Sequence, residues 1–219
     1  MNDYDLRFLS NDGQGPIVIY ISGDHAQNQA EEVYGQARLS AGLCFDFCEV
    51  RVHDWDRFLT PWAAANCMKG RIFAGEGETL LKCFSEDIVP RIIEKFPGHR
   101  AMYLAGYSLA GLFSLWSLYE SGLFDGAVCG SGSLWYPGWK EYMLQSSLTR
   151  KAEVYLSLGR REPESKHPLM KQVGEITKLQ YETLQKNENV KEVTFEWNDG
   201  GHFSDVADRM ARGVHWIVS

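Results

Sequence analysis

Apolar runs and amphipathic stretches alternate along the chain. Residues 16–22 (PIVIYIS) form an unbroken run rich in β-branched and aromatic residues, which is typical of a strand buried on both faces. Residues 43–52, which mix apolar and polar residues, are a second strand candidate, and shorter runs predict strands at 101–105, 126–130, 153–158 and 193–197. Apolar residues recur at helical spacing in 79–96, 109–119, 169–184 and 205–218, and Pro90 is expected to kink the first of these helices. The alternation predicts an α/β fold, a three-layer sandwich with a mostly parallel central sheet flanked by helices.

The length and charge of the chain limit its possible domain organisation and partners. It has 219 residues with no internal repeat or linker-like stretch, so we expect one domain over residues 1–219. The formal net charge is −7, which argues against a nucleic-acid partner and against docking on anionic lipid. We therefore expect a small-molecule partner, and the sequence leaves the oligomeric state open.

The cysteines and the N-terminus favour a cytoplasmic protein. Five cysteines are an odd number, which fits reduced thiols better than a disulfide framework. Cys44 and Cys48 have a spacing that a metal site could use, but no second Cys/His pair follows, so buried thiols are the preferred interpretation. The first five residues form an acidic stretch with no apolar h-region, so they do not resemble a signal peptide.

The motif Gly106-Tyr107-Ser108-Leu109-Ala110-Gly111 lies between a predicted strand and a predicted helix. A turn this tight strains its central residue and exposes the side chain, and it requires small neighbours two residues away on each side. It would lift the Ser108 hydroxyl above the sheet and leave the Leu109 N–H at a helix N-terminus, where it can stabilise a developing negative charge. Ser108 is therefore a candidate nucleophile.

A serine hydroxyl needs a base, and the base needs an acid to orient it. His202 follows the last predicted strand and precedes the last helix, so it is the candidate base; the other five histidines are interpreted as surface or packing residues. Glu162, in the loop after 153–158, is the preferred acid, with Glu164 as the alternative. Asp205 is close to His202 in sequence but is better explained as a helix cap.

A second N–H for an oxyanion hole is expected in the loop after residues 16–22. Asp24 is preferred, and the amides of Gly23 and His25 remain alternatives. If Asp24 serves, its carboxylate must face away from the site, because it would otherwise repel the intermediate. Four aromatic residues are candidates for the substrate-binding wall, namely Trp62, Tyr107, Trp135 and Tyr136.

Four stretches of this chain resemble the esterase family of α/β-hydrolases that includes esterase D and enterochelin-esterase-like proteins. They are residues 54–62 (DWDRFLTPW), 106–111 (GYSLAG), 157–162 (SLGRRE) and 200–203 (GGHF), and the resemblance extends from about Ile17 to Ile217. It implies the α/β-hydrolase fold and gives Ser108, Glu162 and His202 the roles of nucleophile, acid and base. Ala110 departs from the glycine that is common in the family, and the compact length implies the absence of a large cap domain.

These features together predict a serine carboxylic-ester hydrolase that works through an acyl-enzyme and needs no metal or organic cofactor. An acyltransferase or thioesterase could use the same residues, and the resemblance also allows a siderophore-ester hydrolase. A non-catalytic scaffold is the remaining alternative. The sequence does not define the acyl group or the alcohol.

Overall fold

A computed structural model describes residues 3–10, 15–41, 44–64 and 69–219. Leu43, where a strand was expected to begin, and Cys67 lie outside these ranges, as do Met1 and Asn2. The strands are β1 Tyr4–Phe8, β2 Ile17–Gly23, β3 Asp46–Val52, β4 Met102–Tyr107, β5 Gly126–Gly130, β6 Ala152–Gly159 and β7 Val190–Asn198. The α-helices are α1 Gln29–Ala41, α2 Trp55–Phe58, α3 Gly77–Cys83, α4 Val89–Lys95, α5 Leu109–Glu120, α6 Trp139–Gln145, α7 Val173–Leu184 and α8 Val206–Val218. A π-helical segment spans η1 Phe84–Ile88, and 3₁₀ turns span η2 Glu162–Glu164 and η3 Met170–Gln172.

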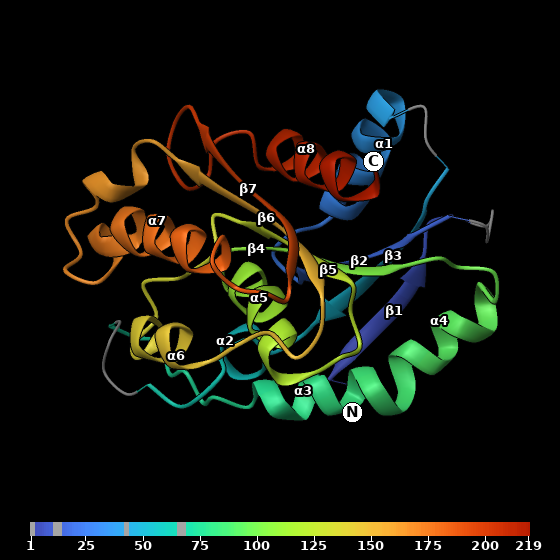
Figure 1. The fold of residues 1–219 in the computed structure, drawn as a ribbon, viewed down its shortest axis with the longest axis horizontal. Helices are drawn as coiled ribbons and strands as arrows, with labels where there is room; N and C mark the ends of the chain where they lie inside the picture. The colour runs from blue at the N-terminus through green and yellow to red at the C-terminus, as the bar shows by residue number, and fades with distance from the viewer. Residues whose placement is uncertain (1–2, 11–14, 42–43, 65–68) are drawn as a thin grey trace.

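The seven strands form one sheet in the order β1-β3-β2-β4-β5-β6-β7 (Figure 1). Neighbouring strands run parallel except for β1, which pairs antiparallel with β3 at one edge. The central strands β2, β4 and β5 are buried along their whole length, as their apolar sequences require. The prediction of a mostly parallel sheet flanked by helices is confirmed.

Two layers of helices cover the sheet. Helices α1 and α8 pack together over one face, where Val33, Tyr20 and Val214 belong to one apolar cluster (Figure 1). The helices α3, α5, α6 and α7 lie over the opposite face and enclose a larger cluster that includes Leu104 and Phe113. No large cap domain stands above the sheet in the ranges that the structure covers. The site must therefore be built from loops.

The expected helix over 79–96 differs in detail. It begins at Gly77 and consists of α3, the π-helical η1 and α4, with Pro90 in the first turn of α4. Proline has no N–H to donate and its ring crowds the preceding turn, so a local widening of the helix accommodates it. The interruption was expected, but its π-helical form was not.

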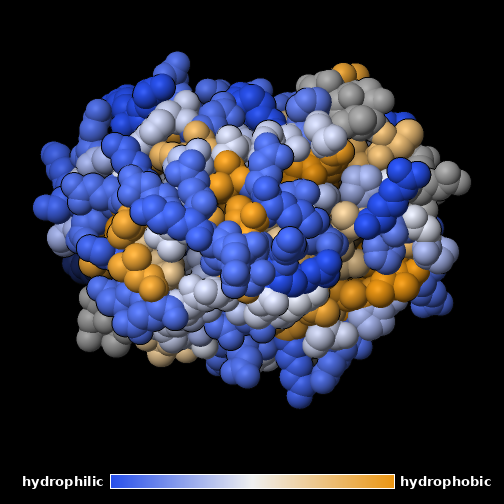
Figure 2. All heavy atoms as spheres, viewed as in Figure 1, coloured by the Kyte–Doolittle hydropathy of each residue, from blue (hydrophilic) through white to orange (hydrophobic). Residues whose placement is uncertain are grey.

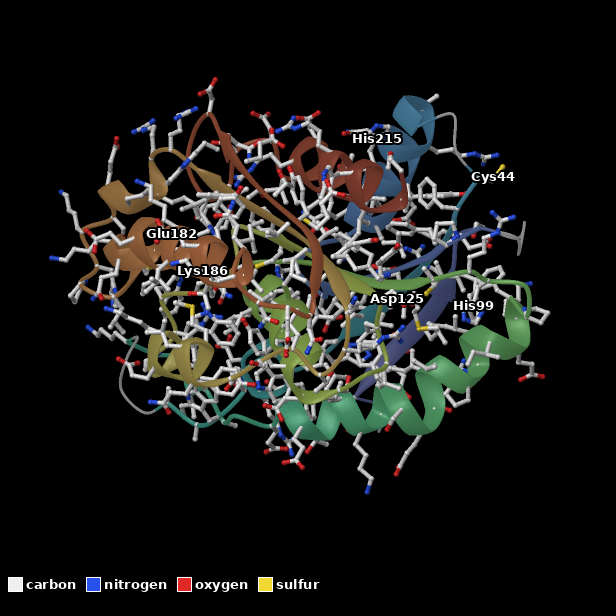
Figure 3. All side chains as sticks on the ribbon, in the orientation of Figure 1. Cys44, His99, Asp125, Glu182, Lys186 and His215 are labelled. Carbon is white, nitrogen blue, oxygen red and sulfur yellow. The ribbon has the colours of Figure 1, made fainter. Side chains whose placement is uncertain are left out.

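In the view of Figure 2, hydrophilic side chains cover most of the visible face and apolar atoms form separate smaller areas. The expectation of a buried thiol is confirmed for Cys48 but wrong for Cys44, which is exposed (Figure 3). Cys129 is buried, and these three cysteines and Cys83 are free thiols. Among the described residues no helix is long and apolar enough to cross a bilayer, and no group of His, Cys, Asp or Glu is arranged to hold a metal ion.

Candidate active site

The chain turns sharply at Ser108 between the end of β4 and the start of α5. Ser108 has φ 61° and ψ −120°, a backbone conformation that side chains other than glycine rarely adopt. A Cβ added at Gly106 would lie 2.4 Å from the Ala110 carbonyl carbon, so only glycine fits there without a backbone shift. Leu109 is the first residue of α5, so its N–H lies at the positive end of the helix. The turn has the geometry that the motif predicted.

The three candidate catalytic residues meet above the carboxyl ends of the strands. His202 Nε2 lies 3.1 Å from Ser108 Oγ, and His202 Nδ1 lies 2.8 Å from Glu162 Oε2. Glu162 stands in the turn after β6, and His202 stands in the loop between β7 and α8. Glu164, the alternative acid, is exposed and pairs with Arg161 at 3.4 Å. The structure thus joins serine, histidine and Glu162 in one chain of hydrogen bonds.

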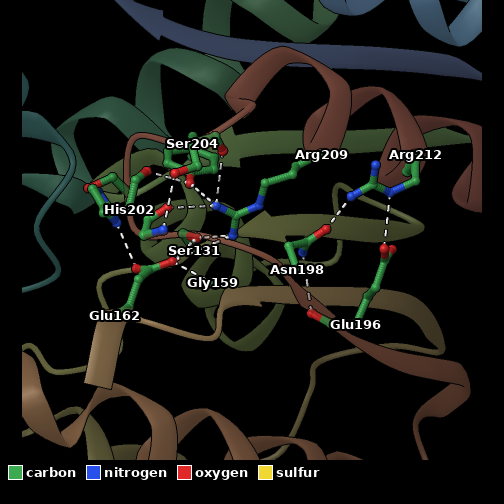
Figure 4. A network of polar contacts seen from close by, with 12 residues as sticks. Ser131, Gly159, Glu162, Glu196, Asn198, His202, Ser204, Arg209 and Arg212 are labelled. Atoms are coloured by element: carbon green, nitrogen blue, oxygen red, sulfur yellow. Dashed lines mark hydrogen bonds and ion pairs between the residues drawn. The ribbon is translucent and has the colours of Figure 1, made fainter. Parts of the chain in front are cut away.

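The other oxygen of Glu162 is also fully engaged. Oε1 accepts hydrogen bonds from the Ser131 hydroxyl at 2.6 Å and from the Gly159 N–H at 2.7 Å (Figure 4). Burial by itself raises the pKa of this carboxyl, but the hydrogen bond and charge of His202, with the Ser131 and Gly159 donors, hold the pKa below its usual value. Glu162 is therefore ionised beside the histidine at neutral pH.

A buried arginine that sequence reasoning missed completes this network. Arg209, on α8, is 1% exposed and donates to the Tyr107 hydroxyl at 2.6 Å. Its guanidinium also contacts Ser131 Oγ and lies 3.5 Å from Glu162 Oε1 (Figure 4). The sequence held a signal, since Arg209 follows Val206 by three residues and therefore falls on the apolar face of α8.

Tyr107 connects the arginine to the histidine loop. Its hydroxyl accepts from Arg209 and donates to the backbone carbonyl of His202 at 2.6 Å. Burial raises the pKa of this hydroxyl to about 12, so it keeps its proton and can make both bonds. Tyr107 was expected to line the substrate wall, and it does line the cavity, but its hydroxyl serves the histidine loop.

The loop after β2 holds the candidates for a second oxyanion donor. The Asp24 carboxylate lies 3.1 Å from His53 Nδ1, and Asp24 is not among the residues that line the cavity above Ser108. The carboxylate is therefore engaged elsewhere, as the use of the Asp24 amide requires. His25 does line this cavity, with its ring against Trp55 at 4.7 Å between centroids. The choice among the amides of Gly23, Asp24 and His25 stays a prediction.

A cavity of about 760 Å³ opens above Ser108. Its wall combines Ser108 and His202 with apolar side chains, among them Trp55, Trp135, Met170 and Phe203. Phe203 follows His202 directly and is 90% exposed, with its ring edge-on to the imidazole at 5.0 Å. Such a wall suits a substrate with apolar groups near the reacting atoms.

Two of the expected wall residues take other positions. Tyr136 is buried and its hydroxyl donates to the Trp62 carbonyl at 2.5 Å, while Trp62 Nε1 donates to the Pro137 carbonyl at 2.7 Å. Neither is among the residues that line the cavity above Ser108. Both lie in an aromatic cluster with Tyr142, since large aromatic rings are more often packing residues than ligand contacts.

Four of the remaining five histidines have partners in the structure, whereas Nδ1 of His215 is buried without a hydrogen-bond partner among the described residues. His53 also contacts Asp5 at 3.2 Å, His99 lies just beyond α4 with Nδ1 3.0 Å from the Phe96 carbonyl, and His215 lies on α8 (Figure 3). Nδ1 of His167 accepts from the Leu169 N–H at 3.3 Å. His25 alone of these five lines the cavity above Ser108.

The chain was compared with known sequences and structures. It matches no protein-family model and no curated protein sequence. Siderophore hydrolase EstA from Aspergillus nidulans has a similar structure, with a TM-score of 0.76 and 16% identity over 98% of this chain and 89% of that one. An IroE-like serine hydrolase from Shewanella oneidensis gives a TM-score of 0.77 at 14% identity, over 98% of this chain and 75% of the other.

A further similar structure is enterobactin hydrolase IroE in a complex with DFP, with a TM-score of 0.69 and 16% identity over 99% of this chain and 89% of that one. At sequence identities this low, the structural similarity shows a shared fold and no more. The resemblance to esterases noted in the sequence is thus confirmed at the level of the fold: this chain has the α/β-hydrolase fold of these hydrolases.

Proposed function

We propose that this protein is a serine hydrolase of small-molecule carboxylic esters that acts through an acyl-enzyme. One observation carries the proposal, namely the unbroken hydrogen-bond chain from Ser108 Oγ through His202 to Glu162 at the floor of an open cavity. The fold shared with hydrolases of the serine type adds support. We further propose that the chain works as a single cytoplasmic domain.

The proposed reaction begins when His202 Nε2 accepts the proton of Ser108 Oγ, which then attacks the ester carbonyl carbon. The negative charge that develops on the carbonyl oxygen is stabilised by the Leu109 N–H and by one N–H of the loop after β2, with Asp24 preferred. His202 returns the proton to the leaving alcohol as the C–O bond breaks. Water then attacks the acyl carbon while His202 accepts its proton, and His202 passes this proton to Ser108 Oγ as the acyl C–Oγ bond breaks, which releases the acid and restores Ser108.

Labelling and hydrolysis test this proposal together. The wild-type protein is expected to react covalently with a fluorophosphonate probe and to cleave a short-chain p-nitrophenyl ester. The Ser108→Ala variant is expected to lose labelling and to lower kcat by about three orders of magnitude or more. Unchanged hydrolysis in that variant would show that the activity does not depend on Ser108.

The neighbours favour one narrower substrate class as a second candidate. Structures similar to this chain include two siderophore hydrolases from Aspergillus nidulans and enterobactin hydrolase IroE, so a siderophore ester is a candidate substrate. Measuring kcat/KM for enterobactin beside acetyl, longer acyl, feruloyl and lactone esters distinguishes a siderophore hydrolase from a hydrolase of simple esters. A kcat/KM for enterobactin below that of the simple esters would exclude this narrower class. Adding an acceptor alcohol to the same assays reports whether acyl transfer competes with hydrolysis.

A further inference from the structure

Arg209 lies where the parts that orient His202 meet. Its side chain is 1% exposed, and its guanidinium reaches residues from four separate segments of the chain. Nη1 donates to the Tyr107 hydroxyl at 2.6 Å and lies 3.4 Å from the Gly201 carbonyl and 3.5 Å from the Ser204 carbonyl. Nη2 contacts Ser131 Oγ and lies 3.5 Å from Glu162 Oε1. Burying a cation in this way costs free energy unless several acceptors compensate it.

We propose that Arg209 is a positioning residue that fixes the acid and the histidine loop relative to each other. This inference rests on the proposed function. Arg209 does not touch the reacting atoms, and it acts through two routes that the contacts define.

The first route runs through the carboxylate. Ser131, Gly159 and Arg209 all face Oε1 of Glu162, which directs Oε2 toward His202 Nδ1 (Figure 4). Ser131 has φ 40°, in the region that side chains rarely occupy, and its hydroxyl lies between Arg209 and Glu162. A strained residue that bridges two buried charges is typical of a functional constraint. Without Arg209 the carboxylate loses one of the contacts that fix its orientation.

The second route runs through the histidine backbone. The Tyr107 hydroxyl accepts from Arg209 and donates to the His202 carbonyl, while Arg209 also faces the carbonyls of Gly201 and Ser204. These contacts hold both sides of His202 in the loop. A shift of about 1 Å in a catalytic group can cost about a hundredfold in rate, so this restraint bears on kcat.

Arg209 is not among the residues that line the cavity above Ser108. Its contacts go to Glu162, Ser131, Tyr107 and the carbonyls of the histidine loop. Loss of Arg209 should therefore disturb the orientation of the base and leave ester binding unchanged, so kcat should fall while KM stays close to the wild-type value.

The test compares kcat and KM for a p-nitrophenyl ester in full-length variants. Arg209→Met, which removes the guanidinium at similar length, is expected to lower kcat by about tenfold or more with KM little changed. Arg209→Lys keeps a donor at this position, so it should recover part of kcat. Arg212→Met is the matched control, because Arg212 lies one turn further along α8, is 42% exposed and pairs with Glu196 (Figure 4). It should keep the wild-type kcat and KM.

Tyr107→Phe provides a second measurement if Arg209→Met does not fold. It removes the hydroxyl between Arg209 and the His202 carbonyl and leaves Arg209 in place, so kcat should fall. A folded Arg209→Met with wild-type kcat would overturn the inference, as would wild-type kcat in Tyr107→Phe. Wild-type protein that neither hydrolyses esters nor labels with the probe would instead refute the proposed function, so the two failures are distinguishable.

Discussion

The serine and the histidine of the site are held in two different ways. Ser108 is placed by backbone geometry, in a turn between β4 and α5 that depends on the absence of a Cβ at Gly106. Its own N–H donates to the Gly130 carbonyl at 3.0 Å, and its carbonyl accepts from the Leu112 N–H at 3.0 Å. The turn is thus formed by residues 106–112 together with backbone contacts to Gly130 at the end of β5 and to Ser133 just after it.

His202 is placed by side chains from distant parts of the chain. Glu162 is 40 residues away in sequence, and the contact between Tyr107 and Arg209 spans 102 residues. The loop that carries His202 lies between β7 and α8 and has no regular backbone pattern of its own. Local geometry therefore sets the nucleophile, whereas a buried polar network sets the base, and the two should respond differently to substitution.

The largest expected loss of activity comes from a substitution that disturbs only the network around His202. Glu162→Gln places an amide beside Nδ1 of His202, which favours the tautomer with its proton on Nε2, facing Ser108. With Nε2 protonated, the ring cannot accept the serine proton, so kcat should fall by about 10³- to 10⁴-fold. Steady-state hydrolysis of a p-nitrophenyl ester measures this.

Glu164→Gln is the matched control for that substitution. Glu164 lies two residues further in the same turn but is exposed and pairs only with Arg161 among the contacts that the structure gives it. Its loss should change kcat by no more than about twofold, as for other surface substitutions. If Glu164→Gln lost most of its kcat while Glu162→Gln stayed active, Glu164 and not Glu162 would be the acid that orients His202.

The next largest effect is expected from a substitution that displaces the backbone turn that carries Ser108. A Cβ at Gly106 would lie 2.5 Å from the Ala110 carbonyl oxygen and 2.7 Å from its Cβ, so Gly106→Ala must displace the first turn of α5. We expect a loss of about 3 kcal/mol in the free energy of unfolding, together with reduced activity, because the nucleophile moves with the turn. Urea unfolding measures the stability.

Gly35→Ala is the control for Gly106→Ala. Gly35 lies inside α1, and a Cβ there would meet no atom within 4 Å. Alanine favours the helix, so the free energy of unfolding should rise by about 0.5–1 kcal/mol. Equal destabilisation at both positions would show that the crowding at the turn is not the cause.

The same contrast explains what the sequence could predict. The strands at β2, β4 and β5 and the turn at Ser108 follow from short local patterns, and their predicted positions agree with the structure to within about two residues. The positions expected for His202 and Glu162 at the ends of β7 and β6 followed from the order of the elements. In each case the deciding signal lies within one segment.

Other features depended on partners that no local pattern reveals. Strand β1 was not predicted, because Tyr4–Phe8 is only half buried and gains its place by pairing with β3. Helix α1 was missed because its buried face consists of small residues such as Ala30 and Ala37 around Val33. Arg209 was missed because an arginine is expected to be exposed. Its burial depends on a carboxylate and two hydroxyls from distant segments, which the sequence does not place beside it.

The smallest expected effect is a pH-dependent change in stability that comes from the charge of Glu162 alone. Its pKa is lowered in the folded protein, so the ionised carboxylate stabilises the fold. That contribution is complete above the unfolded pKa of about 4.3 and is lost as the pH falls through the lower folded value. The difference in Tm between wild type and Glu162→Gln should therefore stay constant above about pH 5 and shrink below about pH 4.

Two features make this measurement specific to the histidine side. Asp87, whose pKa is lowered by the Tyr4 hydroxyl and by Arg91, titrates alike in both proteins and cancels in the difference. Gly106→Ala changes no charge, so its Tm difference from wild type should stay level over the same pH range. A Glu162→Gln difference that grows on acidification would mean that the buried carboxylate is held mainly in its protonated form. In that case Arg209 and His202 would not be the groups that stabilise it, and the network that places the histidine would have to be redrawn around a neutral acid.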